Sequence, residues 1–265
     1  MASLTVPLSL CFCAVFLSPA VADWNILHQN GKHHAALSLA RSRLQISLQN
    51  YCESWRMNVE LHNIRDFKVV PEECVPYIGN YVTSVQYQID SQLTVEECIV
   101  YISTTCSFRK DGKDAWLFDV DDTLLSTIPY FKQHQFGGEM FNATAFEEWA
   151  SKRKATPLEH TMRLYKVLKS MGVQIFLVSS RSENLRSATT DNLVDVGYHG
   201  WKSLFLRGND ELNGGVAQYK ANVRQQLIND GYRIWGTVGD QFNSFAGLPS
   251  AGRTFKLPNP LYYVY

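Results

Sequence analysis

Two aspartates at the end of an apolar run are the residues of this chain best suited to chemistry. Asp119 and Asp121 follow the apolar stretch AWLFDV, and side chains two apart on a strand can face the same side. One carboxylate could then act as a nucleophile and the other as a general acid and base. A solvated acidic turn is the alternative for this pair taken alone.

Three further polar residues favour the catalytic interpretation. Ser179 ends the apolar run IFLVS, Lys220 opens a helical stretch, and Asp240 ends the run IWGTVGD. These types suit phosphoryl transfer, because Ser179 and Lys220 can hold phosphoryl oxygens and neutralise their charge. Taken singly, each of these two residues is more often a strand-end cap or a solvated lysine. A site of oxygen ligands suits Mg²⁺ better than zinc, and the expected ligands are Asp119, Asp240 and the backbone carbonyl of Asp121.

The side chains could meet only if a parallel sheet brought the strand ends together. After residue 113, helical stretches alternate with the short apolar runs AWLFDV, VQIFLVS, SLFLR, YRIWGTVG and RTFKLP. This alternation predicts an α/β fold whose parallel sheet carries helices on both faces and binds ligands beyond the carboxyl ends of its strands. Segment 124–156 interrupts the rhythm. It is aromatic and too long for a simple connection, and we predict that it forms a small cap over the site.

The first 22 residues predict a secretory signal peptide. They contain no charged residue and end in Ala20, Val21 and Ala22, a small-x-small cleavage pattern. A membrane anchor is the alternative, since the apolar run approaches spanning length, but Pro7 and Pro19 favour cleavage. No later segment is apolar enough to span a membrane, so we expect no membrane association after cleavage.

Residues 23–113 predict an N-terminal, mainly helical layer without a pattern that suggests chemistry. In an oxidising compartment its four cysteines are expected to form two disulfides, and three pairings are possible among Cys52, Cys74, Cys98 and Cys106. Zinc binding is disfavoured because no short Cys-x-x-Cys pair occurs.

The charge balance excludes one class of partner. The chain has 25 Lys and Arg against 25 Asp and Glu, so the basic footprint of a nucleic-acid-binding protein is absent. One sequon, Asn142-Ala143-Thr144, predicts N-glycosylation and supports the secretory route.

Four motifs in chain order resemble those of the haloacid dehalogenase superfamily: FDVDDT, LVSSR, YK and VGDQ. Within it, the mature chain is similar to the plant class B acid phosphatases and vegetative storage proteins, through YCESWRMNVE, FGGEMFN, RSENLRSATTDNL, GYRIWGTVGDQ and FKLPNPLYYVY. The resemblance implies a Rossmann-like sheet of order 3-2-1-4-5, counted from AWLFDV, within a phosphatase core at 114–265, and it suggests a homodimer. It implies that Asp119 is the nucleophile and Asp121 the acid and base. It also implies that Ser179 and Lys220 bind the phosphate and that Asp240 binds the metal.

Two positions depart from the family pattern. Ser244 stands where the fourth motif usually has a second Asp, and losing such an outer partner of a metal commonly costs roughly 10- to 100-fold in affinity or activity. Ser180 replaces a Gly and adds a side chain beside the phosphate ligands, either as a further contact or as crowding.

These observations predict an acid phosphatase that hydrolyses small phosphomonoesters through an aspartyl-phosphate intermediate. The alternative, which Ser244 favours, is a vegetative storage or defence glycoprotein that keeps the fold with little or no catalysis. A noncatalytic phosphate binder would give no reason for Asp121. The secretory route predicts a vacuolar location or an extracellular one, such as the cell wall.

Overall fold

The structure is a computed structural model that describes residues 37–208 and 215–264, with side chains from residue 48 onward. The chain divides into two compact units, residues 1–45 and 46–265, and every element below except the start of the first helix belongs to the second. The predicted signal peptide at 1–22 lies outside the described residues. No described helix is both long enough and apolar enough to cross a membrane.

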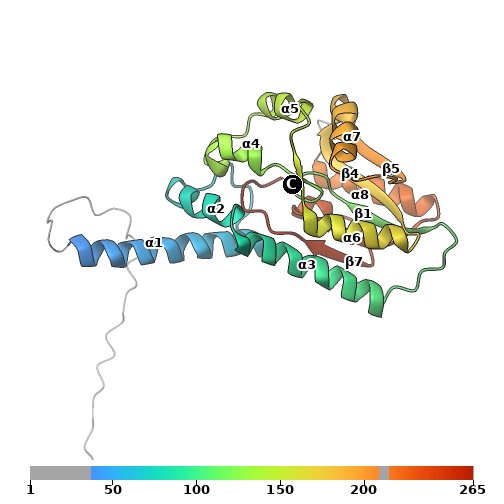
Figure 1. Ribbon diagram of the computed structural model, residues 1–265, viewed down its shortest axis with the longest axis horizontal. Helices are drawn as coiled ribbons and strands as arrows, with labels where there is room; N and C mark the ends of the chain where they lie inside the picture. Colours follow the sequence, from blue (N-terminus) through green and yellow to red (C-terminus); the bar gives the residue numbers. More distant parts are fainter. Residues whose placement is uncertain (1–36, 209–214, 265) are drawn as a thin grey trace, which may run out of the picture. The chain divides into compact units, whose positions relative to one another are not determined.

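Five parallel strands form the central sheet of the second unit (Figure 1). In chain order they are β1 (Asp114–Phe118), β4 (Gln174–Ser182), β5 (Ser203–Arg207), β6 (Arg233–Gly239) and β7 (Arg253–Lys256). Their order in the sheet is β5-β4-β1-β6-β7, and every neighbouring pair is parallel. Counted from β1 this is the order 3-2-1-4-5, so the predicted fold class is confirmed.

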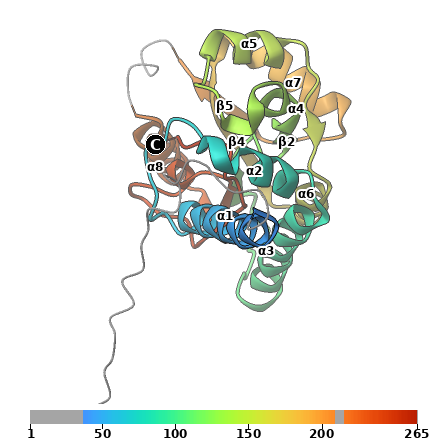
Figure 2. The same ribbon diagram turned by 90° about the vertical axis from the view of Figure 1, so that its left-hand side faces the viewer.

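Alternate residues of β1 face opposite sides of the sheet, and each side is covered by helices (Figure 2). Ala115 and Leu117 pack in one apolar cluster with Val223 of α8 (Val216–Asn229). Trp116 and Phe118 belong to the other cluster, with side chains of α3 (Val85–Thr104), α6 (Glu159–Ser170) and α7 (Arg186–Asp195). All five β1 residues are therefore buried, as expected of a strand covered on both faces.

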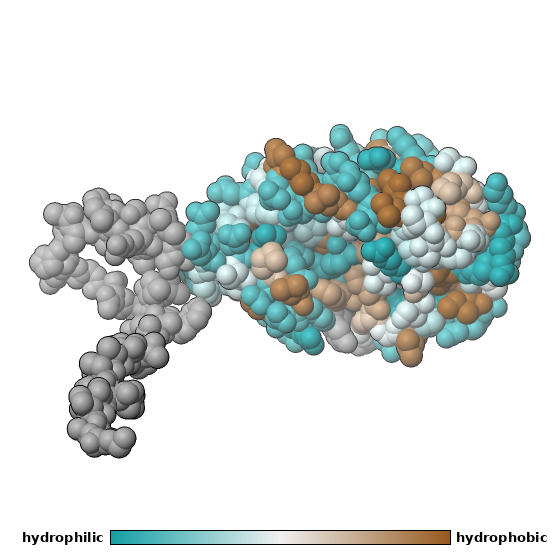
Figure 3. Space-filling view, turned by 90° about the horizontal axis from the view of Figure 1, so that it is seen from below, coloured by the Kyte–Doolittle hydropathy of each residue, from teal (hydrophilic) through white to brown (hydrophobic). Residues whose placement is uncertain are grey.

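The segment that precedes the sheet is helical. It comprises α1 (Leu37–Glu60), the short 3-10 helix η2 (Glu72–Cys74), α2 (Val75–Val82) and α3. Ser84 caps α3 by accepting hydrogen bonds from the amides of its first turn. The outer side of α3 exposes apolar residues such as Leu93, which is 56% exposed, and Figure 3 shows separate apolar areas on this face among hydrophilic ones.

Only one of the two expected disulfides is present. Cys52 of α1 bonds Cys74, which joins α1 to the start of α2, whereas Cys98 and Cys106 are free thiols. The prediction of a second bridge is therefore wrong. Cys98 is buried within α3, whereas Cys106 lies beyond the helix end at Thr104, where its amide donates to the Tyr101 carbonyl.

Between the first two strands of the sheet, the chain makes an excursion on a two-stranded antiparallel stem. The stem strands are β2 (Leu125–Ser126) and β3 (Thr156–Pro157). Between them lie α4 (Ile128–Gln133), the 3-10 turn η3 (Gln135–Gly137) and α5 (Ala143–Ser151). We call residues 125–157 the insertion. The sequon residue Asn142 is exposed at its surface, where its side-chain oxygen caps α5 through the Ala145 amide at 3.1 Å.

The cysteine arrangement predicts a count and a stability change. Thiol titration of the unfolded, unreduced protein without residues 1–22 should find two thiols. Cys52→Ala should lower the free energy of unfolding by about 3 kcal/mol, because the bridge closes a loop across 22 residues. Urea unfolding measures this loss, and Cys98→Ala in the same assay separates it from the removal of a buried thiol. A titration that finds none would restore the second bridge.

Candidate active site

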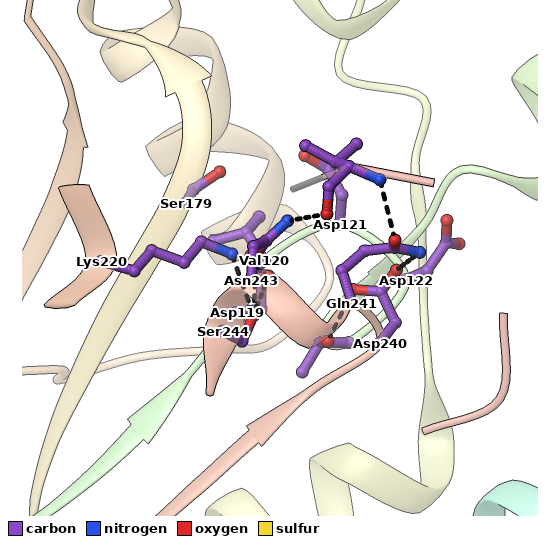
Figure 4. Close-up of polar contacts among 12 residues, drawn as sticks. Asp119, Val120, Asp121, Asp122, Ser179, Lys220, Asp240, Gln241, Asn243 and Ser244 are labelled. Atoms are coloured by element: carbon purple, nitrogen blue, oxygen red, sulfur yellow. Dashed lines mark hydrogen bonds and ion pairs between the residues drawn. The ribbon is translucent and has the colours of Figure 1, made fainter. Parts of the chain in front are cut away.

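Asp119 lies directly beyond β1, and its carboxylate is enclosed by donors (Figure 4). Its backbone amide continues the sheet pairing by donating to the Val238 carbonyl at 3.0 Å. One carboxylate oxygen accepts from the Val120 amide at 2.8 Å. The other accepts from the Lys220 ammonium and from the Ser244 hydroxyl, the latter at 2.8 Å. The side chain is thus fixed in orientation by three donors.

Lys220 is the buried cation beside this carboxylate. It comes from the first half of α8, is only 3% exposed, and donates both to Asp119 and to the Ser244 hydroxyl, the latter at 3.0 Å. A buried ammonium is tolerated where a carboxylate pairs with it. Lys220 therefore faces the aspartate that the sequence singled out, although 101 residues separate the two.

Ser244 lies against Asp119 itself, which its position in the fourth motif did not reveal. It ends the 3-10 turn η6 (Phe242–Ser244), which follows β6. A Cβ placed on Gly239 would come within 2.7 Å of the Ser244 side chain, so glycine at 239 permits this close approach. The hydroxyl accepts from Lys220 and donates to Asp119, whereas the sequence predicted only that this position acts on a metal.

Asp240, at the carboxyl end of β6, is the second buried carboxylate. One of its oxygens accepts from Asn259 at 2.6 Å and is in reach of the Tyr262 hydroxyl at 3.1 Å, and Thr123 approaches the other at 3.5 Å. Burial, reinforced by repulsion from Asp119, raises the pKa of Asp240 to about 6. Asn259 and Tyr262 both come from the C-terminal tail, so the end of the chain helps to build this site.

Asp122 is a third buried carboxylate, and sequence reasoning did not assign it a role. It accepts from both the amide and the hydroxyl of Thr127, and the Tyr262 hydroxyl lies 2.9 Å away. Burial, followed by repulsion from Asp240, raises the pKa of Asp122 to about 7. The doublet of aspartates in FDVDDT was the only signal for it, and both aspartates are buried, Asp122 at 1% exposure and Asp121 at 9%.

Asp121 is paired with an arginine that the sequence analysis also missed. The Arg181 guanidinium donates to both carboxylate oxygens, at 2.9 Å and 2.7 Å, and its third nitrogen donates to the Thr189 hydroxyl at 3.0 Å. Arg181 is 4% exposed. Such a two-pronged pair fixes the orientation of the Asp121 carboxylate.

The two adjacent serines near the carboxyl end of β4 lie differently. Ser179 is fully buried, and its hydroxyl accepts from the Arg181 amide at 3.2 Å. Ser180 lines a cavity that also reaches Asp121. Successive strand residues face opposite sides, so only one of these hydroxyls can point to a given ligand.

The charge of the site and its donor types fit a divalent cation. Of the four carboxylates Asp119, Asp121, Asp122 and Asp240, two form ion pairs within the described part of the chain, Asp119 with Lys220 and Asp121 with Arg181. All four offer oxygen, the ligand that Mg²⁺ prefers. Their oxygens, however, are turned toward protein donors, and among the described residues no three His, Cys, Asp or Glu side chains are arranged as a metal cluster.

Comparison with known proteins decides the family. The family model described as HAD superfamily, subfamily IIIB (acid phosphatase) matches residues 37–265. The chain belongs to this family. Acid phosphatase 1 of Solanum lycopersicum is 37% identical to it over 213 residues, which cover 80% of this chain and 83% of the relative. The predicted membership of this family is thereby confirmed.

Other relatives of this chain are named as a stem glycoprotein and as a vegetative storage protein. The stem 28 kDa glycoprotein of Glycine max is 40% identical over 80% of this chain and 84% of its own length, and vegetative storage protein 1 of Arabidopsis thaliana is 39% identical over 85% and 83%. Among solved structures, a class C acid phosphatase from Bacillus anthracis with tungstate bound has a TM-score of 0.60 at 18% identity and covers 71% of this chain and 85% of its own. The likeness to that structure shows a shared fold.

The buried ion pair between Lys220 and Asp119 predicts a strong coupling in stability. Lys220→Met should lower the free energy of unfolding by about 3–5 kcal/mol, because it leaves the Asp119 carboxylate buried without a counter-charge. In an Asp119→Asn background the same substitution should cost at least about 1 kcal/mol less. Urea unfolding of the four proteins measures this difference. Equal losses in both backgrounds would show that the two side chains are not coupled.

Proposed function

We propose that this chain is a magnesium-dependent acid phosphatase that hydrolyses small phosphomonoesters through an aspartyl-phosphate on Asp119. The observation that carries the proposal is the juxtaposition of Asp119 and Lys220, with Asp121 two residues further on and facing the cavity lined by Ser180. At this edge of the sheet Asp119 would act as the nucleophile, Lys220 as the cation for the phosphoryl group and Asp121 as the proton donor.

In the first step, an oxygen of the Asp119 carboxylate bonds to phosphorus while the bond from phosphorus to the leaving oxygen breaks. Asp121 in its acid form gives a proton to that oxygen and keeps its other oxygen on Arg181. In the second step, water adds to phosphorus, the bond to Asp119 breaks, and Asp121 takes the proton of the water. Lys220 and Ser179 would hold the phosphoryl oxygens during both steps.

The remaining assignments belong to the same proposal. A magnesium ion would be held by Asp119, Asp240 and the Asp121 carbonyl, and it would neutralise charge on the phosphoryl group. The insertion would act as the cap, over a core at 114–265. Secretion to the vacuole or the extracellular space, glycosylation at Asn142 and a homodimer stay predictions from the sequence.

A storage or defence glycoprotein with little catalysis is the second candidate function. Ser244 favours it, because the hydroxyl gives the fourth motif one carboxylate fewer than the family pattern. The names of the stem glycoproteins and of the vegetative storage protein agree with it. The two functions differ in turnover rather than in fold.

Hydrolysis of a generic aryl phosphate by the purified protein, with and without Mg²⁺, tests the proposal. We expect turnover that depends on Mg²⁺ and that Asp119→Asn lowers by at least about 1000-fold, because the nucleophile is lost. Asp195→Asn, at an exposed aspartate of α7, is the matched control and should retain wild-type turnover. If Asp119→Asn hydrolyses the ester as fast as wild type, the aspartate-nucleophile mechanism is wrong.

Replacing Ser244 distinguishes a weakened enzyme from a storage protein. Ser244→Asp adds a carboxylate next to Lys220 and should raise Mg²⁺ affinity and phosphatase activity roughly 10- to 100-fold, as measured by calorimetry and turnover. Ser244→Asn, similar in size but uncharged, should bring no gain.

Other outcomes of this experiment identify the cause. Appreciable wild-type turnover with no response to Ser244→Asp indicates an enzyme adapted to the serine, whereas negligible turnover in both proteins indicates the storage function. Ser180→Gly tests crowding beside the phosphate, because a gain from that change alone would locate the defect in phosphate binding.

A further inference from the structure

The cavity that reaches Asp121 has a mainly apolar lining with a few polar groups. Its volume is about 420 Å³. Asp121, Thr127 and Ser180 contribute polar groups, and the exposed Lys68 adds a cation. The rest of the lining is aromatic or aliphatic, with contributions from the insertion and from the C-terminal tail. A cavity of this size and composition is typical of a small-molecule site.

The inner wall is fixed by aromatic packing and hydrogen bonds. Phe131 of α4 stacks on Tyr262 with ring centroids 5.0 Å apart and planes 17° apart. The Tyr262 hydroxyl in turn contacts Asp122 and Asp240. The apolar wall and the buried carboxylates are therefore parts of one packed unit, so a group bound against this wall has a defined position relative to the site.

The mouth of the cavity exposes large apolar side chains of the insertion. Met140 is 68% exposed and Phe141 is 54% exposed. The Phe141 ring packs against that of Phe146 on α5, with ring centroids 5.6 Å apart. An apolar occupant would cover these side chains and gain the free energy of removing them from water, roughly 25 cal/mol per Å². A polyol would gain little of it, and those of its hydroxyls that face Met140 and Phe141 would have no hydrogen-bond partner there.

We propose that this cavity binds the leaving group of the substrate and selects phosphomonoesters of aromatic or other apolar alcohols. The presence of Asp121 in the lining supports this occupant, because Asp121 is the residue proposed to protonate the leaving oxygen. The inference rests on the proposed function, and it adds a substrate class and the residues that select it. Phe141 and Met140 are the specificity-determining residues.

Kinetics with two substrates test the selection. Wild-type kcat/KM should be at least about 10-fold higher for 1-naphthyl phosphate than for glycerol 2-phosphate. Phe141→Ala and Met140→Ala should each lower the value for the naphthyl ester, Phe141→Ala by about 10-fold, which corresponds to about 1.4 kcal/mol. Both variants should leave the value for the glycerol ester within about two-fold.

Leu93→Ala is the matched control, because Leu93 is also apolar and exposed but lies on α3 outside the cavity lining. It should leave both kcat/KM values unchanged. If Phe141→Ala lowers kcat/KM for both esters by the same factor, or for neither, the inference is wrong while the proposed function stands.

Binding of phosphonates, which the protein cannot hydrolyse, tests the cavity without catalysis. Calorimetry should show that benzylphosphonate binds at least about 10-fold more tightly than methylphosphonate, and that Phe141→Ala removes most of this difference. A wild-type protein that hydrolyses neither ester but shows this preference would refute the proposed function and support the cavity. Equal affinities for the two phosphonates would overturn the inference whatever the turnover.

Discussion

The buried negative charge at the carboxyl edge of the sheet is the constraint on which the rest of the site depends. Asp119 and Asp240 end adjacent strands, and their carboxylates are removed from water among apolar neighbours. Burying a carboxylate costs several kcal/mol unless hydrogen bonds and counter-charges offset the cost. Lys220 and Arg181 supply counter-charges from α8 and β4, so the packing of these elements against the strand ends is also the condition for ionised side chains there.

The same constraint explains why the chain returns to its starting point at the C-terminus. Asn259 and Tyr262 follow β7 and donate to carboxylates at the ends of β1 and β6. Tyr262 also stacks on the insertion through Phe131, and Asp122 accepts from Thr127, where the insertion's first helix begins. The insertion and the tail are thus anchored to the carboxylates that they enclose. A change of position in either one would disturb hydrogen bonds to buried charge.

Members of this family are named as phosphatases and as storage proteins, and the site suggests how one fold can support both. Asp119, the proposed nucleophile, and Lys220 also serve stability, because the two side chains neutralise each other in the interior. Loss of catalysis therefore does not require loss of these residues. Ser244 likewise serves stability without contributing to metal binding. Its hydroxyl forms hydrogen bonds with both Lys220 and Asp119 but adds no charge toward a metal.

The sequence by itself determined the alternation of strands and helices and the polar residues at the strand ends, because periodicity and strand termini are local properties of the chain. It therefore predicted that Asp119 and Asp240 would share one edge of a parallel sheet, while the strand order came from family resemblance. Only the tertiary structure decided which thiols pair, that Arg181 holds Asp121, and that Tyr262 closes the site. Those contacts join distant segments, and the partner of a buried charge or thiol is selected by distances and burial that only the packed chain defines.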